Sequence, residues 1–269
     1  MVSAMPDPVA RSYLFVPAKR LDRIEKAQTT TADVIIVDLE DSVLEQDKDE
    51  ARDQLTRLTP SRDLHVRVNA VTTPHFEADV AMLAEVKWLG GIVLPMVRSS
   101  EDVERLVGLL ATHVPILALV ETAQGVVAAE QIAASGVGRL AFGGADYAAD
   151  LGATPSESLF AYPRARLVVA SVAAGIPAPV DGPTMVLKDD DRLIEEATVA
   201  RSLGMGGKLC IHPSQIAPVA EVFGPTAAEE RWAREILKAR EDHGDGVFVV
   251  NGEMVDAPVL ARAERIVAR

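Results

Sequence analysis

Short apolar runs alternate with longer amphipathic segments along most of this 269-residue chain. The run Val34–Asp38 is β-branched and apolar up to its last residue, which is typical of a strand buried on both faces of a parallel sheet. Further runs of this kind predict strands that begin at Tyr13, Leu64, Gly91, Ile116, Arg139, Ile176 and Gly207. Strands that alternate with helices predict a parallel sheet, and eight of them predict closure into a (β/α)8, or TIM, barrel. An open doubly wound sheet is the alternative.

Capping-box patterns mark three of the predicted helix starts. In this pattern a Ser or Thr is followed three residues later by an acidic or amide residue, and each side chain bonds the other's backbone N–H. The pairs are Ser99 with Asp102, Thr154 with Glu157, and Thr226 with Glu229. We therefore predict that a helix begins directly after the first residue of each pair.

The chain continues past the eighth strand with segments that a barrel does not need. Thr226 opens a helix, and a final helix is predicted over Val259–Ala268. Between them, Val247–Val250 and Glu253–Val255 flank Asn251-Gly252, a pair that favours a type I′ hairpin turn. We expect a barrel domain over residues 1–223 and a helix–hairpin–helix extension over residues 224–269. We also expect the extension to pack on a neighbouring subunit.

Charge and composition narrow the class of protein. Lys and Arg number 27 and Asp and Glu number 40, so the net charge of −13 disfavours nucleic acid and anionic membranes as partners. No apolar run approaches the roughly 20 residues of a membrane span. The first residues lack the basic start and apolar stretch of a signal peptide. Cys210 is the one cysteine, so no internal disulfide can form. We expect a cytoplasmic protein.

Two carboxylates stand at the ends of successive predicted strands. Glu121 follows the apolar run that begins at Ile116, and Asp146 follows the run that begins at Arg139. A charge at the end of a buried strand is costly unless something compensates it. Mg²⁺ prefers oxygen ligands and would fit such a pair, whereas the scattered histidines offer no zinc site. The alternative is that both carboxylates cap or electrostatically favour the helices that follow them.

Other polar residues are predicted at the same edge of the barrel, namely Asp38, Glu40, Asp41, Arg67, Asn69 and His212. The planar guanidinium of Arg67 matches a substrate carboxylate, and an internal salt bridge to Glu40 or Asp41 is the alternative. His212 could orient backbone or take part in chemistry. A basic stretch after the first strand holds Lys19, Arg20, Arg23 and Lys26. It could bind a phosphorylated ligand or form a solvated helix face.

Seven motifs, in order along the chain, resemble those of the citrate lyase beta subunit-like family within the HpcH/HpaI aldolase superfamily. They are Arg11–Pro17, Asp38–Ser42, Arg67–Asn69, Val120–Ala123, Gly143–Asp146, Ile211–Ile216 and Gly252–Pro258. The resemblance spans nearly the whole chain. It implies an Mg²⁺-dependent carbon–carbon lyase that acts on a coenzyme A thioester with a distal carboxylate, with citramalyl-CoA, cleaved to acetyl-CoA and pyruvate, as the expected substrate.

Several other activities compete with this one. The resemblance also covers malyl-CoA lyases and the citryl thioester lyase subunit of a citrate lyase complex. A class II pyruvate aldolase is disfavoured, because such enzymes are expected to have a histidine where Asp41 follows Glu40. A catalytically silent scaffold is the remaining alternative.

The resemblance also implies roles for individual residues. Glu121 and Asp146 would be the Mg²⁺ ligands, and Arg67 would bind the substrate oxygen and the thioester enolate. Phe15 and Arg20 would lie on the coenzyme A side of the substrate pocket. Asp256 would be the acid/base residue, supplied by a neighbouring subunit of a homotrimer or a dimer of trimers. On its own sequence context, Asp256 could equally cap the terminal helix.

Two positions depart from the family pattern. Met96 stands where relatives often have lysine, and Ala18 stands where glycine is usual. The loss of a positive charge near the mouth of the barrel changes the electrostatics that a substrate meets, so these motifs leave the oxo acid open.

Overall fold

The computed structural model describes residues 10–110, 113–244 and 246–267. The chain forms two compact units, Met1–Ala220 and Glu221–Arg269, and helix α10 (Ile216–Phe223) contains the division between them. Ala268, predicted to end the last helix, and the N-terminal residues judged against a signal peptide lie outside the described residues. No helix among the described residues is both long and apolar enough to cross a bilayer.

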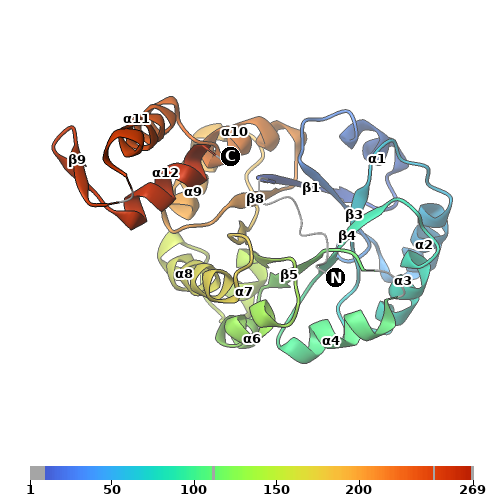
Figure 1. Ribbon diagram of the computed structural model, residues 1–269. Coiled ribbons are helices and arrows are strands. Elements are labelled where there is room, and N and C mark those ends of the chain that lie inside the picture. Colours follow the sequence, from blue (N-terminus) through green and yellow to red (C-terminus); the bar gives the residue numbers. More distant parts are fainter. Residues whose placement is uncertain (1–9, 111–112, 245, 268–269) are drawn as a thin grey trace. The chain divides into compact units, whose positions relative to one another are not determined.

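Eight parallel strands close into a barrel, with neighbours in sequence order and β1 paired with β8 (Figure 1). The strands are β1 (Ser12–Pro17), β2 (Val34–Asp38), β3 (Leu64–Arg67), β4 (Leu89–Leu94), β5 (Ile116–Val120), β6 (Arg139–Phe142), β7 (Val180–Asp181) and β8 (Gly207–Cys210). The prediction of a TIM barrel is therefore confirmed, and the open sheet is excluded. The register pairs Asp38 with both Pro17 and Arg67, which brings three strand ends to one edge.

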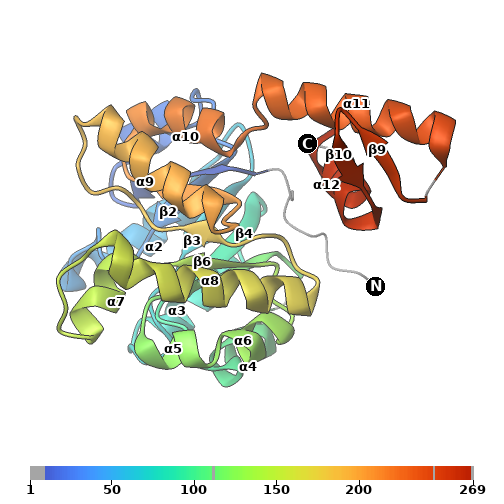
Figure 2. The ribbon, with the colours of Figure 1, turned by 90° about the vertical axis from the view of Figure 1, so that its left-hand side faces the viewer.

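Helices cover the outside of the barrel (Figures 1 and 2). They are α1 (Leu21–Ala27), α2 (Lys48–Thr56), α3 (Phe76–Leu83), α4 (Ser100–Leu109), α5 (Ala123–Val127), α6 (Ala129–Ala134), α7 (Gly144–Asp150), α8 (Glu157–Ala174), α9 (Asp190–Ser202) and α10, with 3₁₀ turns η1 (Glu45–Asp47) and η2 (Pro213–Gln215). This arrangement buries both faces of the sheet, which explains why β2 is apolar up to its last residue, Asp38.

The helix starts confirm two of the three predicted capping boxes. Ser99 and Thr226 each form the reciprocal box with the acidic residue three positions later. The box predicted at Thr154 is wrong. Ser156 caps α8 instead by accepting a hydrogen bond from the Leu159 N–H at 3.2 Å. Glu157 cannot close a box at Thr154, because it lies in the first turn and its carboxylate accepts from Arg164 at 2.5 Å.

The seventh strand is shorter than predicted. The apolar run from Ile176 predicts a strand up to Val180, but β7 contains only Val180 and Asp181. Pro177 and Pro179 have no N–H to donate to a neighbouring strand, so the ladder cannot extend over this run.

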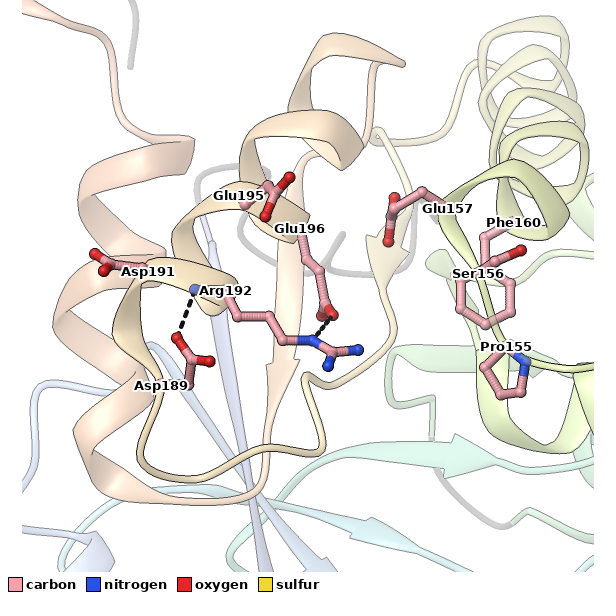
Figure 3. A pocket seen from close by; sticks show the side chains of 9 residues that line it. All are labelled: Pro155, Ser156, Glu157, Phe160, Asp189, Asp191, Arg192, Glu195 and Glu196. Atoms are coloured by element: carbon pink, nitrogen blue, oxygen red, sulfur yellow. Dashed lines mark hydrogen bonds and ion pairs between the residues drawn. The ribbon is translucent and has the colours of Figure 1, made fainter.

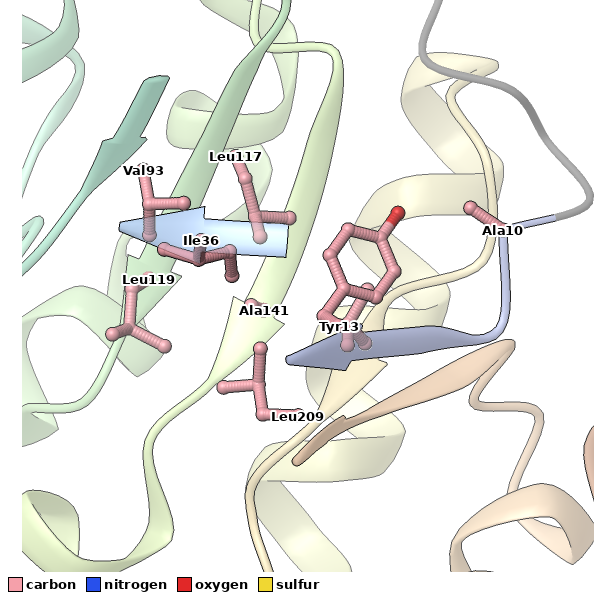
Figure 4. Close-up of a cluster of buried hydrophobic side chains, with 9 residues drawn as sticks. Ala10, Tyr13, Ile36, Val93, Leu117, Leu119, Ala141 and Leu209 are labelled. Carbon is pink, nitrogen blue, oxygen red and sulfur yellow. The ribbon is translucent and has the colours of Figure 1, made fainter. Parts of the chain in front are cut away.

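Apolar side chains fill the barrel interior (Figure 4). The cluster contains Ala10, Tyr13, Ile36, Val93, Leu117, Leu119, Ala141, Val180 and Leu209, and all of them are buried. Arg139 is buried beside this cluster and donates to the Ala10 carbonyl at 2.7 Å and to the Tyr13 hydroxyl at 2.8 Å. A filled interior leaves the strand ends as the place for ligands, as is usual for this fold.

The C-terminal unit has a small core of its own. Helix α11 (Ala227–His243), strands β9 (Phe248–Val250) and β10 (Glu253–Val255), and helix α12 (Ala257–Val267) bury Ala233, Ile236, Phe248, Val255, Leu260 and Ala263. The strands are antiparallel, and Asn251 and Gly252 both have positive φ, which confirms the predicted hairpin turn. The remaining side chains of this hairpin include Val247, Val249 and Met254, which are apolar and exposed.

A buried ionic cluster joins two strands to a helix on the outside of the barrel. Asp181 accepts hydrogen bonds from Lys208 Nζ at 2.7 Å and from Arg164 Nε at 2.7 Å. All three side chains are almost completely buried. Removing one member of such a cluster leaves an uncompensated charge in the interior.

We predict that Asp181→Ala lowers the free energy of unfolding of the barrel by about 3–5 kcal/mol, the usual effect of breaking a buried ion pair. Urea unfolding of a Trp232→Phe background, followed by fluorescence, measures this, because Trp88 is then the one tryptophan and lies in the barrel. The matched control is Glu77→Ala, which removes an exposed ion pair with Arg105 and should cost less than about 1 kcal/mol. Equal effects of the two substitutions would contradict the prediction.

Candidate active site

A cavity of about 780 Å³ opens at the carboxyl ends of the barrel strands. Its lining includes four residues predicted for the active site, namely Phe15, Arg67, Glu121 and Asp146. They come from β1, β3, the residue after β5 and the first turn of α7. The fold thus brings together side chains that are far apart in the sequence.

Glu121 is buried at the base of this cavity. The backbone N–H of Met96 donates to its Oε1 at 2.7 Å. On its other side the Glu121 side chain lies against Gly143, where an added Cβ would come within 2.3 Å of Oε2. The pKa of Glu121 is raised to about 8, mainly by burial and also by the charges of Glu40 and Asp146, against the opposing hydrogen bond from Met96.

Asp146 is more exposed than Glu121 and occupies the first turn of α7. Burial and the charge of Asp41 raise its pKa, although Arg67 opposes the shift. Neither predicted metal ligand is a helix cap. Thr122 caps α5 by accepting from the Gly125 N–H at 3.1 Å, and Gly143 is the N-cap of α7. Neither Glu121 nor Asp146 therefore acts as a helix N-cap. Asp146 can still interact favourably with the dipole of α7, because it lies in the first turn of that helix.

Arg67 is held by three carboxylates. Its Nε and Nη2 donate to the two oxygens of Asp38 at 2.6 and 2.8 Å, and its Nη1 lies 2.8 Å from Glu40 and 3.1 Å from Asp41. The guanidinium carbon also lies 4.8 Å from the centre of the Phe15 ring. The internal salt bridges considered as an alternative are thus present. The pairing with Asp38 was not predicted, although both residues end neighbouring strands in register.

The turn that carries these acids is fixed from behind by a buried lysine. Lys48 Nζ donates to the carbonyls of Leu39 and Glu40 at 2.8 and 2.9 Å and to Asn69 Oδ1 at 2.6 Å. Asn69 in turn donates to Asp79. Sequence reasoning placed Asn69 at the mouth and missed Lys48, whose position on α2 looked like one of many charged helix residues. Its burial is visible only once α2 is packed on the barrel.

The cavity carries more negative than positive charge around Arg67. Burial and the charges of Asp41, Asp38 and Asp146 raise the pKa of Glu40 to about 8, against the pull of Arg67. Burial opposes ionisation of Asp38 too, but the charge and hydrogen bonds of Arg67 keep its pKa below the usual value. An added divalent cation would relieve this repulsion. No set of three or more His, Cys, Asp or Glu side chains converges as a metal site within the described ranges. A cation here would therefore keep water or substrate ligands, as Mg²⁺ commonly does.

The basic stretch after β1 is divided in two. Arg23 and Lys26 line the cavity. Arg20 does not line this cavity and instead forms a bidentate pair with Asp22, at 2.8 and 2.7 Å. Lys19 pairs with Glu50 at 2.7 Å. The structure thus brings the second half of the stretch to the site and leaves its first half in local ion pairs.

His212 and Asp256 each make a local backbone contact. His212 lines the cavity, and its Nδ1 accepts from the Ser214 N–H at 3.2 Å, so His212 caps η2. Asp256 lies in the C-terminal unit, where its Oδ1 accepts from the Val259 N–H at 3.2 Å at the start of α12. The capping role considered for Asp256 is therefore present, and this contact leaves its other oxygen for a second role.

A second cavity, of about 510 Å³, lies between the starts of α8 and α9 (Figure 3). Its lining is largely acidic and contains none of the predicted site residues. Arg192 lies within it and donates to Glu196 at 2.9 Å, while the Arg192 N–H donates to Asp189 at 3.0 Å. These contacts satisfy the arginine locally, so we assign no ligand to this cavity.

Two protein-family models and several known proteins match this chain. A family model described as HpcH/HpaI aldolase/citrate lyase matches residues 11–213, and one described as C–C bond lyase of the TIM-barrel fold matches residues 165–269. A citrate lyase subunit beta-like protein of Deinococcus radiodurans is 35% identical over 98% of both chains. The mitochondrial citramalyl-CoA lyase of Rattus norvegicus is 31% identical, with 96% of this chain and 85% of that protein covered. The (3S)-malyl-CoA thioesterase of Cereibacter sphaeroides is 36% identical over 96% of both chains.

The fold is shared with a solved structure as well. Protein CitE from Mycobacterium tuberculosis, in complex with magnesium, acetoacetate and coenzyme A, superposes with a TM-score of 0.83 at 34% identity, covering 97% of each chain. The predicted resemblance is thereby confirmed. The chain belongs to the HpcH/HpaI aldolase/citrate lyase family and is a carbon–carbon lyase of the TIM-barrel fold.

Proposed function

We propose that this protein is an Mg²⁺-dependent lyase that cleaves citramalyl-CoA to acetyl-CoA and pyruvate. The observation that carries the proposal is the convergence of Glu121, Asp146, Arg67 and Phe15 on one cavity at the barrel mouth. Relatives named citramalyl-CoA lyase, and a relative solved with magnesium and coenzyme A, support the same substrate class. The buried cysteine, Cys210, is consistent with the cytoplasmic location that we propose.

Glu121 and Asp146 are the residues that would hold Mg²⁺. Both are carboxylates, which are hard oxygen ligands, and both have raised pKa values because they lie in an acidic, partly buried site. When bound, the cation supplies Lewis-acid polarisation of the substrate's hydroxyl and carboxylate oxygens. Gly143 keeps the space beside Glu121 free of a side chain.

The reaction that this site supports is a retro-Claisen cleavage. A base removes the proton of the substrate's tertiary hydroxyl, and the oxygen's electron pair forms the carbonyl of pyruvate. The carbon–carbon bond breaks, and its electron pair moves to the thioester half as an enolate. Proton delivery to the methylene carbon then yields acetyl-CoA. Glu40, whose carboxylate lies 2.8 Å from Arg67 Nη1, would receive the hydroxyl proton in its ionised form.

Arg67 would stabilise the enolate oxygen by charge and hydrogen bonding. Asp38 fixes its plane by the bidentate pair, and Phe15 packs on its face. The Asp41 side chain is the most exposed of the three carboxylate partners, at 73%. A substrate oxygen can therefore replace Asp41 at Nη1 without disturbing the pair with Asp38.

Asp256 would deliver the proton to the methylene carbon from a neighbouring subunit of a homotrimer or a dimer of trimers. Two exposed apolar surfaces support assembly. One is the outer hairpin set Val247, Val249 and Met254, and the other is the α8 set Tyr162, Val169 and Val172. Apolar surfaces of this kind are typical of protein–protein contacts. A hairpin buried against another subunit would fix the position of Asp256, which directly follows β10.

Coenzyme A would bind along the side of the cavity formed by Phe15 and α1. Arg23 and Lys26 are the cationic residues of that lining and suit the phosphates of the cofactor portion. Met185 and Leu187, between β7 and α9, form an apolar part of the same lining. Arg20 would join them on leaving its pair with Asp22.

Malyl-CoA is the second candidate substrate, because the relative named (3S)-malyl-CoA thioesterase is 36% identical. A panel of citramalyl-CoA, malyl-CoA, citryl-CoA and a citryl thioester of a carrier protein, each with and without Mg²⁺, separates these activities. The proposed lyase releases pyruvate and acetyl-CoA from citramalyl-CoA. A thioesterase instead releases free coenzyme A and the hydroxy acid from malyl-CoA. Turnover only of a carrier-protein thioester would identify a subunit of a citrate lyase complex and overturn the proposal.

We predict that excess EDTA abolishes cleavage of citramalyl-CoA and that Mg²⁺ restores it. Glu121→Ala and Asp146→Ala should each lower kcat/KM by about 10³-fold or more, because the substrate loses its electrophilic partner. Steady-state assays of acetyl-CoA release measure both effects. Glu104→Ala, which removes an exposed carboxylate of α4, is the matched control and should behave as wild type. Full activity in EDTA would exclude a metal.

The raised pKa values predict how stability depends on pH. Glu40 and Glu121 titrate at about 8 in the folded protein and near 4.5 when unfolded, so the folded state binds more protons between these values. Stability contributed by these two groups is therefore full below pH 4.5 and is lost as the pH rises through 8. In EDTA, Tm of wild type should fall over this window relative to the Glu40→Gln/Glu121→Gln double variant. Mg²⁺ should flatten the fall. A Tm difference that stays constant with pH would refute this.

Mixing two inactive variants tests whether Asp256 acts in trans. Glu121→Ala and Asp256→Ala proteins, after subunit exchange, should regain up to about one quarter of wild-type activity, since one site in four then pairs intact residues from two subunits. The control is the mixture of Glu121→Ala with Asp146→Ala, which lie in the same unit and should not complement. If confirmed exchange restores no activity to the first mixture, Asp256 does not act from a neighbouring subunit.

A further inference from the structure

The turn after β4 contains a strained residue next to the proposed metal ligand. Met96 and Asn251 are the non-glycine residues with positive φ in the part of the chain that the structure describes, both at 53°. Asparagine adopts this backbone readily, and Asn251 needs it for the hairpin turn. Methionine does not, and the left-handed conformation costs such a residue about 1–2 kcal/mol. Met96 therefore holds an unfavourable backbone that other contacts must maintain.

The turn after β4 donates two successive backbone N–H groups, those of Met96 and Val97, to the C-terminal end of β5 and the residue after it. The Met96 N–H donates to Glu121 Oε1 at 2.7 Å. The Val97 N–H donates to the Leu119 carbonyl at 3.2 Å. One bond thus ties the turn to the strand, and the other ties it to the carboxylate that follows the strand.

Contacts on the far side keep the turn in place. The Val97 carbonyl oxygen lies so close to Gly125 that an added Cβ there would come within 2.3 Å of it. Val97 is also fully buried. The turn cannot relax toward a more favourable φ by moving outward, because α5 blocks it through Gly125.

Glu121 is consequently confined from two directions. The Met96 N–H fixes Oε1 of Glu121 by a hydrogen bond. On the other side Gly143 lies directly against Glu121, since a Cβ added at Gly143 would come within 2.3 Å of Oε2 and 2.5 Å of the Glu121 Cβ. A ligand held in this way loses little rotamer freedom when a cation binds. A strained residue beside a binding group is the pattern expected when strain maintains a functional geometry.

We infer that Met96 is a positioning residue whose left-handed backbone, and not its side chain, orients Glu121 for Mg²⁺. The inference rests on the proposed role of Glu121 as a metal ligand. If it is correct, the Mg²⁺ affinity of variants at position 96 depends on how readily the new residue adopts a positive φ. Residues that adopt positive φ should preserve Mg²⁺ binding, and residues that avoid it should weaken binding.

Isothermal titration of the full chain with Mg²⁺ alone, without substrate, tests this. Met96→Gly and Met96→Asn should bind Mg²⁺ within about twofold of wild type, because both residues adopt positive φ readily. Met96→Val should bind about tenfold more weakly, since a β-branched residue disfavours this backbone most strongly. Met96→Ala should also bind within about twofold of wild type, because it removes the side chain while keeping a backbone preference close to that of methionine. Met96→Thr, which is also β-branched, serves if the valine variant does not fold.

Asn251→Val is the matched control, because Asn251 has the same φ but lies in the hairpin. It should lower Tm and leave the Mg²⁺ affinity unchanged. Equal Mg²⁺ affinity of wild type and the β-branched variant would overturn the inference and leave the metal site intact. Loss of affinity in Met96→Gly and Met96→Asn as well would assign the effect to the side chain and overturn it too. A wild-type protein that binds no Mg²⁺ would instead remove the proposed metal site, and the inference with it.

Discussion

Buried negative charge at the mouth of the barrel is the constraint on which the site depends. The register of β2 and β3 places Asp38 opposite Arg67, so the bidentate ion pair of the mouth follows from strand pairing. Glu40 and Glu121 remain under-compensated, as their raised pKa values show. Lys48 holds the acidic turn from behind through backbone carbonyls and does not neutralise its carboxylates. The protein thus maintains a deficit of positive charge, which is the condition under which a divalent cation binds strongly.

The periodicity of the sequence predicted the barrel because each strand needs only a short apolar run to identify it. The presence of Glu121 and Asp146 in one cavity followed from the order of the predicted strands, since the fifth and sixth strands are neighbours in any such barrel. Features that depend on register or packing did not follow. The Asp38–Arg67 pair needs the stagger of two strands, and the burial of Lys48 needs the docking of a helix. The cap predicted at Thr154 is wrong because α8 begins two residues later, where Ser156 caps it.

Family membership and local geometry answer different questions about the substrate. Family membership indicates carbon–carbon bond cleavage, and the carboxylates at the strand ends are the residues that we propose hold the cation for it. Discrimination between oxo acids is expected from residues that vary around that centre. In our proposal Met96 contributes only its backbone to Glu121, so a methionine where the family pattern suggests a lysine would leave the ligand geometry intact. Met185 and Leu187 add an apolar surface to the same cavity.

The shortness of β7 has a mechanical consequence for the barrel. Prolines leave β6 and β7 paired in register at only Ala141 and Val180. The Arg139 guanidinium partly replaces the missing ladder, because its Nε donates to the Ala178 carbonyl at 2.6 Å across the same gap. Closure of the cylinder at this seam therefore depends on one backbone register pair supplemented by a side chain. Local opening of the native state should begin between β6 and β7, where amide hydrogens will exchange with solvent before those of the remaining strands.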